Sequence, residues 1–151
     1  MYTRHDTRSG FTLIEIMAVV LIIALLTTLV GIAIVPQIDK SRVSTARAQL
    51  KMLDAAIETY RMDNIRFPTT DQGLQALIVP PPDARNYQPG GYLRERRIPL
   101  DPWGNPYQYE APGQHNDHAY DLWSFGADGA PGGEGVDADI GNWAADEIAE
   151  G

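Results

Sequence analysis

Residues 11–35 read FTLIEIMAVVLIIALLTTLVGIAIV, and this stretch decides the fold. It holds 25 residues with a single ionisable side chain, Glu15. As a helix rising about 1.5 Å per residue it would measure about 37 Å, which exceeds the roughly 30 Å of a bilayer's hydrocarbon core. The sequence therefore predicts a transmembrane helix over residues 11–35.

The flank of this run sets its orientation. Residues 1–10, MYTRHDTRSG, carry Arg4 and Arg8, so the positive-inside rule places the N-terminus in the cytoplasm and the remainder outside. A bacterial inner membrane fits best. No Ala-x-Ala signal interrupts the run, so we expect the helix to stay attached to the mature protein. On apolar length alone, an ordinary signal anchor remains an open alternative.

Glu15 makes a plain anchor less satisfactory. A carboxylate in the middle of a membrane helix costs about 2.5 to 3.5 kcal/mol and normally has a partner or a function. No basic residue lies within residues 11–35. A cut between Gly10 and Phe11 would create an amine one helical turn from Glu15. A neighbouring subunit shifted along the membrane normal could then bring its own amine to this carboxylate.

Residues 8–17, RSGFTLIEIM, resemble the class III signal of type IV pilins and of type II secretion pseudopilins. The resemblance implies that residues 1–10 are a leader which a prepilin peptidase removes between Gly10 and Phe11. It also implies N-methylation of Phe11 and a role for Glu15 in subunit docking.

Residues 36–64 are expected to form an amphipathic helix outside the membrane. Pro36 lacks a backbone donor, so we expect a bend or local melting there. Beyond it, apolar residues recur at spacings of three and four, which predicts one buried stripe. The stripe consists of Val43, Ala46, Leu50, Leu53, Ile57 and Tyr60.

Residues 65–151 are expected to form a small globular head. Thr69 and Gln72 stand at capping-box spacing before a short second helix. Alternating patterns at residues 107–109 and 120–125 predict strands. The expected fold is α+β, with a long N-terminal helix packed on an antiparallel sheet of two or three strands.

Three stretches of the head closely resemble the major pseudopilin of type II secretion systems. They are FPTTDQGLQAL (residues 67–77), DPWGNPYQY (101–109) and DADIGNW (137–143), so that the resemblance covers residues 8–143. It implies a type IV pilin-like structural subunit that polymerises into a periplasmic filament and helps to push folded proteins through the outer membrane. The alternative is a surface pilin for adhesion, motility or DNA uptake. Such pilins usually close a longer head with a disulfide, and this chain has no cysteine.

The resemblance also implies partners and a location. The partners are other copies of the chain, minor pseudopilins, the prepilin peptidase, the inner-membrane assembly platform and the secretion ATPase complex. The chain would cross the inner membrane once, with its C-terminal domain in the periplasm and later in the filament. A net charge of −8 argues against nucleic-acid binding through a basic surface.

The acidic C-terminal third suggests a metal. Residues 98–151 hold eleven Asp and Glu but no Lys or Arg, and glycines in residues 126–135 let a loop fold back on itself. Calcium needs six to eight oxygens. An EF-hand starting at Asp128 fails, because Ala130 and Gly132 occupy ligand positions. The residue pattern alone leaves a calcium site and a solvated acidic loop equally open.

The resemblance favours calcium. It implies ligands from the carboxylates of Asp128, Asp137 and Asp139 and from the main-chain oxygen of Phe125, with Glu134 as a lesser candidate. The metal would then attach the last segment to the sheet and take the place that a disulfide would hold.

Catalysis is not expected. His115 and His118 lie in a polar loop without a third zinc ligand at a convincing spacing, and no nucleophile or phosphate-binding motif occurs. A third alternative, a signal-anchored periplasmic calcium protein, would keep Met1.

Overall fold

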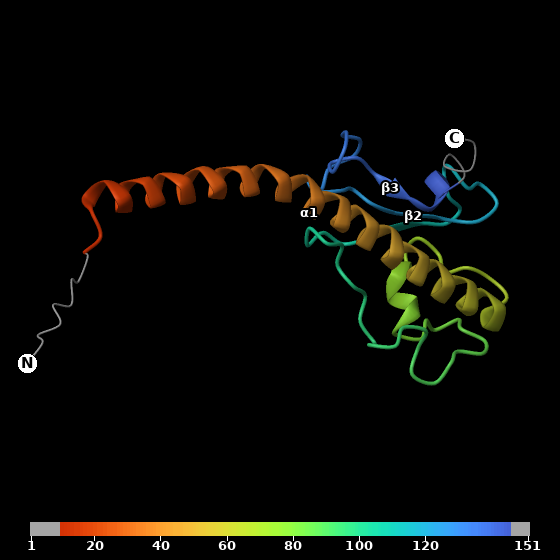
Figure 1. The fold of residues 1–151 in the computed structure, drawn as a ribbon. Helices are drawn as coiled ribbons and strands as arrows, with labels where there is room; N and C mark the ends of the chain where they lie inside the picture. Colours follow the sequence, from red (N-terminus) through yellow and green to blue (C-terminus); the bar gives the residue numbers. More distant parts are fainter. Residues whose placement is uncertain (1–9, 146–151) are drawn as a thin grey trace, which may run out of the picture. The chain divides into compact units, whose positions relative to one another are not determined.

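The computed structural model describes the backbone of residues 10–145 and the side chains of residues 10–27 and 37–143. Residues 1–9 of the predicted leader lie outside the described part. Two compact units divide the chain, Met1–Ile38 and Asp39–Gly151. The long helix α1, Leu13–Asn64, contributes to both (Figure 1).

Helix α1 is continuous through Pro36, so the predicted local melting does not occur. Proline removes one backbone donor, and therefore one intrahelical hydrogen bond. The helix nevertheless runs on, and the two predicted helical stretches form one element of 52 residues.

The head contains a three-stranded antiparallel sheet in the order β1-β2-β3. Its strands are β1, Gln108–Glu110; β2, Asp121–Ser124; and β3, Ile140–Gly141. Tyr109 lies opposite Leu122, and Trp123 lies opposite Gly141. The predicted α+β class is confirmed. Strand β3 is only two residues long, so an alternating sequence pattern could not have predicted it.

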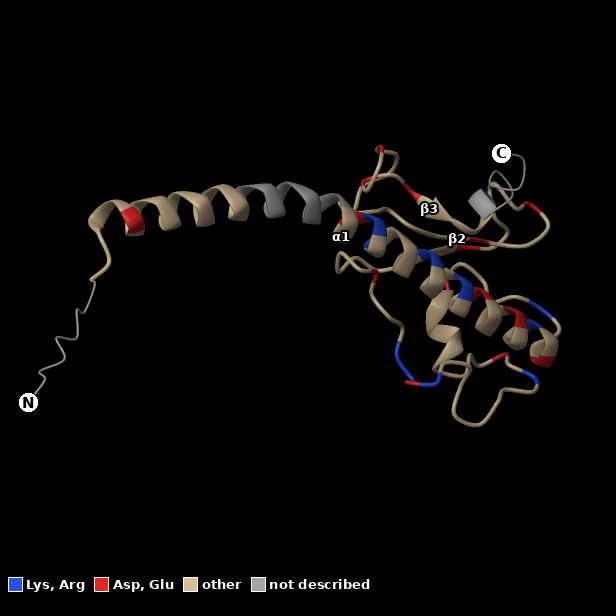
Figure 2. Ribbon diagram, viewed as in Figure 1, with Lys and Arg blue, Asp and Glu red and all other residues tan. Residues whose placement is uncertain are grey.

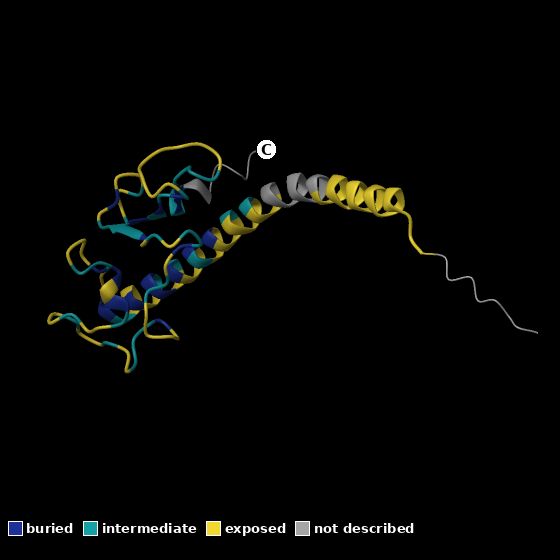
Figure 3. Cartoon of the chain, turned by 90° about the vertical axis from the view of Figure 1, so that its left-hand side faces the viewer, coloured by how far each residue is buried: buried dark blue, intermediate teal, exposed yellow. Residues whose placement is uncertain are grey.

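The core lies between one side of α1 and the sheet. Leu53, Ile57 and Tyr60 of the helix are completely buried, as is Leu122 of β2. Figure 3 shows buried residues, in dark blue, along one side of the second half of α1. Each of the three aliphatic side chains contributes about 1.5 to 3 kcal/mol by leaving water. The stripe predicted from spacings of three and four is thereby confirmed, although its first member, Val43, is only partly buried.

Two tyrosines of the head form hydrogen bonds with side chains of α1. The Tyr107 hydroxyl donates to Oε1 of Gln49 at 2.6 Å, and the Tyr120 hydroxyl donates to Oδ1 of Asp54 at 2.5 Å. Burial, reinforced by the hydrogen bond to Asp54, raises the pKa of Tyr120. The phenol therefore stays protonated at neutral pH and remains a donor.

The second helix is a short 3-10 turn, η1, Gly73–Leu77. The predicted capping pair forms one turn earlier, where Thr69 N donates to Gln72 Oε1 at 3.0 Å and Gln72 N donates to Thr69 Oγ1 at 3.3 Å. Gly73 has a φ of +54°, outside the right-handed helical region, so the turn cannot continue as an α-helix.

Asn64 closes the C-terminal end of α1. Its buried amide donates to Tyr60 O at 3.1 Å and to the Tyr92 hydroxyl at 3.0 Å, and its Oδ1 accepts from Arg85 N at 3.0 Å. One side chain thus satisfies a helix carbonyl and fixes the following loop.

The core assignment predicts a contrast between two neighbouring positions. Leu53→Ala should lower the free energy of unfolding by about 2 to 5 kcal/mol, because it leaves a cavity in the helix–sheet interface. Met52→Ala, at a half-exposed position, should change it by about 0.5 kcal/mol or less. Urea unfolding followed by tryptophan fluorescence measures both, and equal losses would show that the stripe is misplaced.

Candidate functional site

The N-terminal part of α1 exposes apolar side chains on all of its faces. Between Phe11 and Leu26, the large hydrophobic side chains are from 50% to 82% exposed. Glu15 is the one charged residue in this stretch, as Figure 2 shows. A helix that is apolar all round requires apolar surroundings, either lipid or other copies of the same helix.

Glu15 has partners within its own chain that the sequence analysis missed. Its Oε2 accepts from Thr12 N at 3.3 Å and from Thr12 Oγ1 at 3.4 Å, while Glu15 N donates to Thr12 Oγ1 at 3.3 Å. Together these contacts form a capping box at the start of α1. The T-x-x-E spacing at residues 12–15 is the signal that could have revealed it. No partner of Oε1 is found among the described residues.

Among the described residues, no helix segment combines the length and the hydropathy needed to cross a membrane. The predicted span, residues 11–35, includes positions 28–35, whose side chains lie outside the described part.

The three predicted aspartate ligands lie on the loop between β2 and β3. Asp128 is exposed, and its Oδ1 accepts from Ala130 N at 3.1 Å. Asp139 Oδ2 accepts from Gly132 N at 3.0 Å. Ala127 N donates to Val136 O at 2.9 Å, so the two arms of the loop run side by side.

One oxygen in this loop lacks a partner. Oδ1 of Asp139 is buried and makes no hydrogen bond within the described part of the chain. A buried carboxylate oxygen without a donor is costly, and a bound cation would remove that cost. The donor set therefore suits a hard cation.

The described side chains do not by themselves form a complete site. No group of three or more His, Asp or Glu side chains in the described regions is arranged to hold a metal ion. Main-chain oxygens would have to supply the other ligands. The calcium prediction, including Asp137 and Glu134, is neither confirmed nor contradicted by this geometry.

Gly126 allows the loop to close. Its φ is +74°, and a Cβ there would lie 2.8 Å from Val136 O and 2.9 Å from Ala138 O. Only glycine permits this approach. Main-chain oxygens from the second arm of the loop therefore gather at the residue that follows Phe125.

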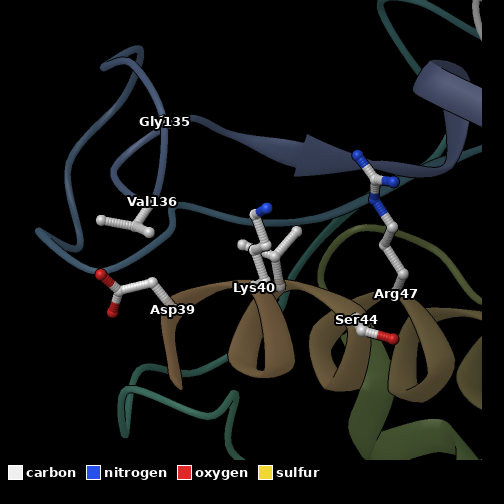
Figure 4. A pocket seen from close by; sticks show the side chains of 7 residues that line it. Asp39, Lys40, Ser44, Arg47, Gly135 and Val136 are labelled. Carbon is white, nitrogen blue, oxygen red and sulfur yellow. The ribbon is translucent and has the colours of Figure 1, made fainter. Parts of the chain in front are cut away.

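Two cations of α1 face the same loop. Lys40 and Arg47 line a hollow of about 460 Å³ whose opposite wall is Gly135 and Val136 (Figure 4). Neither cation forms an ion pair with any described residue, and the loop's carboxylates also lack a basic partner there. Asp39 lines the same hollow, with its carboxylate beside Val136, so α1 presents both signs of charge there (Figure 4).

A second polar centre, around Asp121, was not predicted. The buried carboxylate accepts from three successive backbone amides, those of Gln114 at 2.8 Å, His115 at 2.8 Å and Asn116 at 3.0 Å. Burial alone would raise the pKa of Asp121. These bonds, together with the His115 ring, outweigh burial and hold the pKa below its ordinary value.

The same centre explains two residues of the DADIGNW stretch. Asn142 Oδ1 accepts from Leu122 N at 3.1 Å and from Asn116 Nδ2 at 3.2 Å. Trp143 stacks on the His115 ring with centroids 3.9 Å apart. His115 therefore packs against the C-terminal segment, whereas the side chain of His118 is almost fully exposed.

Two family models together match the chain from residue 6 to residue 143. Residues 6–34 match the prokaryotic N-terminal methylation motif, and residues 33–143 match the type II secretion system protein G domain. The chain belongs to the type II secretion system protein G family. The resemblance seen in the head, including DPWGNPYQY and DADIGNW, is confirmed.

Relatives of the family span nearly the whole chain. The chain is 48% identical over 139 residues to type II secretion system core protein G of Pseudomonas aeruginosa, covering 90% of this chain and 95% of the relative. It is 45% identical over 138 residues to the core protein G of Vibrio cholerae, covering 90% and 92%.

A solved structure of the family is also similar. The crystal structure of the major pseudopilin from the type 2 secretion system of enterohaemorrhagic Escherichia coli superposes with a TM-score of 0.61 at 44% identity. The match covers 72% of this chain and 92% of that one.

The lowered pKa of Asp121 predicts a pH dependence. Ionised Asp121 stabilises the folded head above its unfolded pKa of about 3.9, and this contribution is lost as the pH falls through the lower folded value. Asp121→Asn should cost about 1 to 3 kcal/mol at pH 7, because amide donors lose a charged acceptor. The gap to wild type should shrink as the pH falls from about 3.9 through the lower folded pKa, because Asp121 of the wild type is then protonated as well.

Urea unfolding at pH 7 and pH 3 measures this gap. Asp117→Asn, which removes a well-exposed carboxylate in the same region, serves as the control and should change little at either pH. A gap that stays constant over the whole range would contradict the assignment.

Proposed function

We propose that this chain is the major structural subunit of a type II secretion pseudopilus. The observation that carries the proposal is the continuous family match over residues 6–143, from methylation motif to protein G head. The subunit polymerises through its N-terminal helix into a periplasmic filament that helps to drive folded proteins through the outer membrane. It acts by assembly and not by catalysis.

Processing is the first step of this proposal. A prepilin peptidase cuts between Gly10 and Phe11 and methylates the new amine. The methylation-motif match over residues 6–34 supports this, because it spans the junction. Gly10 is exposed, and a Cβ there would meet nothing within 4 Å, so the junction is accessible in the described part of the chain.

The apolar helix then has two successive environments. Before assembly, residues 11–35 cross the inner membrane with the head in the periplasm. After assembly, the exposed apolar side chains between Phe11 and Leu26 pack against those of neighbouring subunits. The apolar side chains are shielded from water in both states, by lipid before assembly and by neighbouring subunits afterwards. Leaving the bilayer therefore does not expose them to water.

Glu15 guides the assembly. Its Oε2 belongs to the capping box with Thr12, which leaves Oε1 for the methylated Phe11 amine of a neighbour. An ion pair is worth far more in an apolar filament core than in water, because the effective dielectric constant is lower.

Other components complete the system. The partners are further copies of the chain, minor pseudopilins, the prepilin peptidase, the inner-membrane assembly platform and the secretion ATPase.

The capping box allows the two roles of Glu15 to be separated. Glu15→Gln keeps a capping-box side chain but loses the charge, whereas Thr12→Val loses the cap but keeps the carboxylate. We expect Glu15→Gln to reduce filament yield at least tenfold, with Thr12→Val near wild type. Electron microscopy of sheared filaments gives the yield, and gel mobility confirms that both variants are cleaved. Normal filaments from Glu15→Gln would refute the docking role.

We also propose that calcium binds the loop between β2 and β3. The carboxylates of Asp128, Asp137 and Asp139 and the main-chain oxygen of Phe125 would hold it, with Glu134 as a weaker candidate. The support is the unpartnered, buried Oδ1 of Asp139. Calcium, when bound, would offset part of the loop's negative charge and attach the segment after residue 139 to the sheet.

Calcium should accordingly stabilise the protein. At one hundred times its Kd, the metal should add about 2.7 kcal/mol to the free energy of unfolding. Thermal unfolding of the full chain in detergent, with calcium and with chelator, measures the shift. Asp139→Asn should abolish it, while the exposed Asp117→Asn should keep it. Identical midpoints with metal and with chelator would eliminate the site.

A further inference from the structure

The main-chain oxygen of Phe125, a predicted calcium ligand, belongs to the peptide unit that joins Phe125 to Gly126. The N–H of this peptide unit makes a hydrogen bond to a side chain. The carbonyl of Phe125 shares a rigid plane with the N–H of Gly126, so whatever holds that N–H also fixes the direction of the carbonyl. Gly126 N donates to Ser124 Oγ at 3.1 Å. The carbonyl is thereby directed away from Ser124.

Ser124 is itself fixed by a buried carboxylate. Its hydroxyl donates to Asp101 Oδ2 at 2.6 Å, and this bond leaves the hydroxyl lone pairs free to accept from Gly126. Ser124 is 0% exposed and Asp101 is 4% exposed. A buried, charge-assisted hydrogen bond of this kind has little freedom to rotate.

The second oxygen of Asp101 organises a turn that reaches the same loop. Oδ1 accepts from Trp103 N at 3.0 Å and from Asn105 N at 2.8 Å. The Asn105 side chain then donates to Gly126 O at 3.0 Å. The peptide units on both sides of Gly126 are therefore fixed by groups that lead back to Asp101.

We propose that Asp101 and Ser124 are positioning residues for the metal loop, which aim the Phe125 carbonyl at the cation. This inference rests on the calcium site proposed above and adds two residues that do not touch the metal. It gives the DPWGN turn at residues 101–105 a role in metal affinity in addition to its role in the fold.

Removing the Ser124 hydroxyl tests the aiming directly. Ser124→Ala leaves the Gly126 N–H without its acceptor and frees the Phe125 peptide to rotate. Partners that orient metal ligands typically contribute 10- to 100-fold in affinity, so we expect calcium to bind about tenfold more weakly. Ser124→Thr keeps a hydroxyl and should restore most of the affinity. Asp101→Asn should weaken binding similarly.

The measurement is calorimetric titration of calcium chloride into the full-length protein in detergent micelles. Asn64→Ala is the matched control, since Asn64 is also buried and hydrogen-bonded but serves the loop after α1. It should lower the unfolding midpoint and leave the calcium Kd unchanged. Unfolding curves without metal confirm that each variant is folded.

The outcomes separate the two proposals. A wild-type protein that gives no calcium binding refutes the metal site and the positioning role together. A wild-type protein that binds calcium, with Ser124→Ala binding equally well, overturns only the positioning role. Equal weakening by Asn64→Ala would also overturn it, because general destabilisation would then explain the loss.

If Ser124→Ala does not fold, Asn105→Ala carries the same test from the other side of Gly126, and an unchanged Kd in that variant overturns the inference.

Discussion

The head depends on the burial of one stripe of α1 against the short sheet. Leu53, Ile57 and Tyr60 have no exposed surface, and Leu122 on β2 meets them from the other side. The strands are too short to be stable on their own, since isolated hairpins are marginal in water. The helix supplies the apolar surface that the sheet lacks. A helix that extends beyond the head can therefore serve assembly at one end and the core at the other.

Hydrogen bonds of buried polar side chains connect the loops and the C-terminal segment to the sheet. Asp101 links a turn to β2, and Asp121 gathers the backbone of residues 114–116. Asn142 joins that loop and β2 to the C-terminal segment. The last segment is thus held by hydrogen bonds as well as by the proposed metal. The chain achieves this without a cysteine.

Much of this fold could be predicted from local patterns. Spacings of three and four identified the helical stripe, and alternating residues identified β1 and β2. Glycine's freedom explained why the loop after β2 can fold back, which Gly126 does with a positive φ. The capping box of Thr12 and Glu15 is equally local, and the T-x-x-E spacing at residues 12–15 is enough to predict it.

The rest depended on contacts between residues far apart in the chain. Ser124 and Asp101 lie 23 positions apart, and Asn142 and Asn116 lie 26 apart. No spacing rule relates such pairs, because the fold alone brings them together. The same reason kept Asp121 from standing out among the eleven acids of the C-terminal third. Continuity of α1 through Pro36 was also beyond local rules, since a single missing hydrogen bond does not decide whether a long helix stops.

The central claim is that a cut helix terminus turns this membrane-anchored chain into a filament subunit. Intact-mass and N-terminal peptide mass spectrometry of the protein purified from its native membrane tests this most directly. The account predicts a mature chain that begins with N-methylated Phe11 and lacks residues 1–10. A chain that retains Met1 with an unmodified Gly10–Phe11 bond would contradict it.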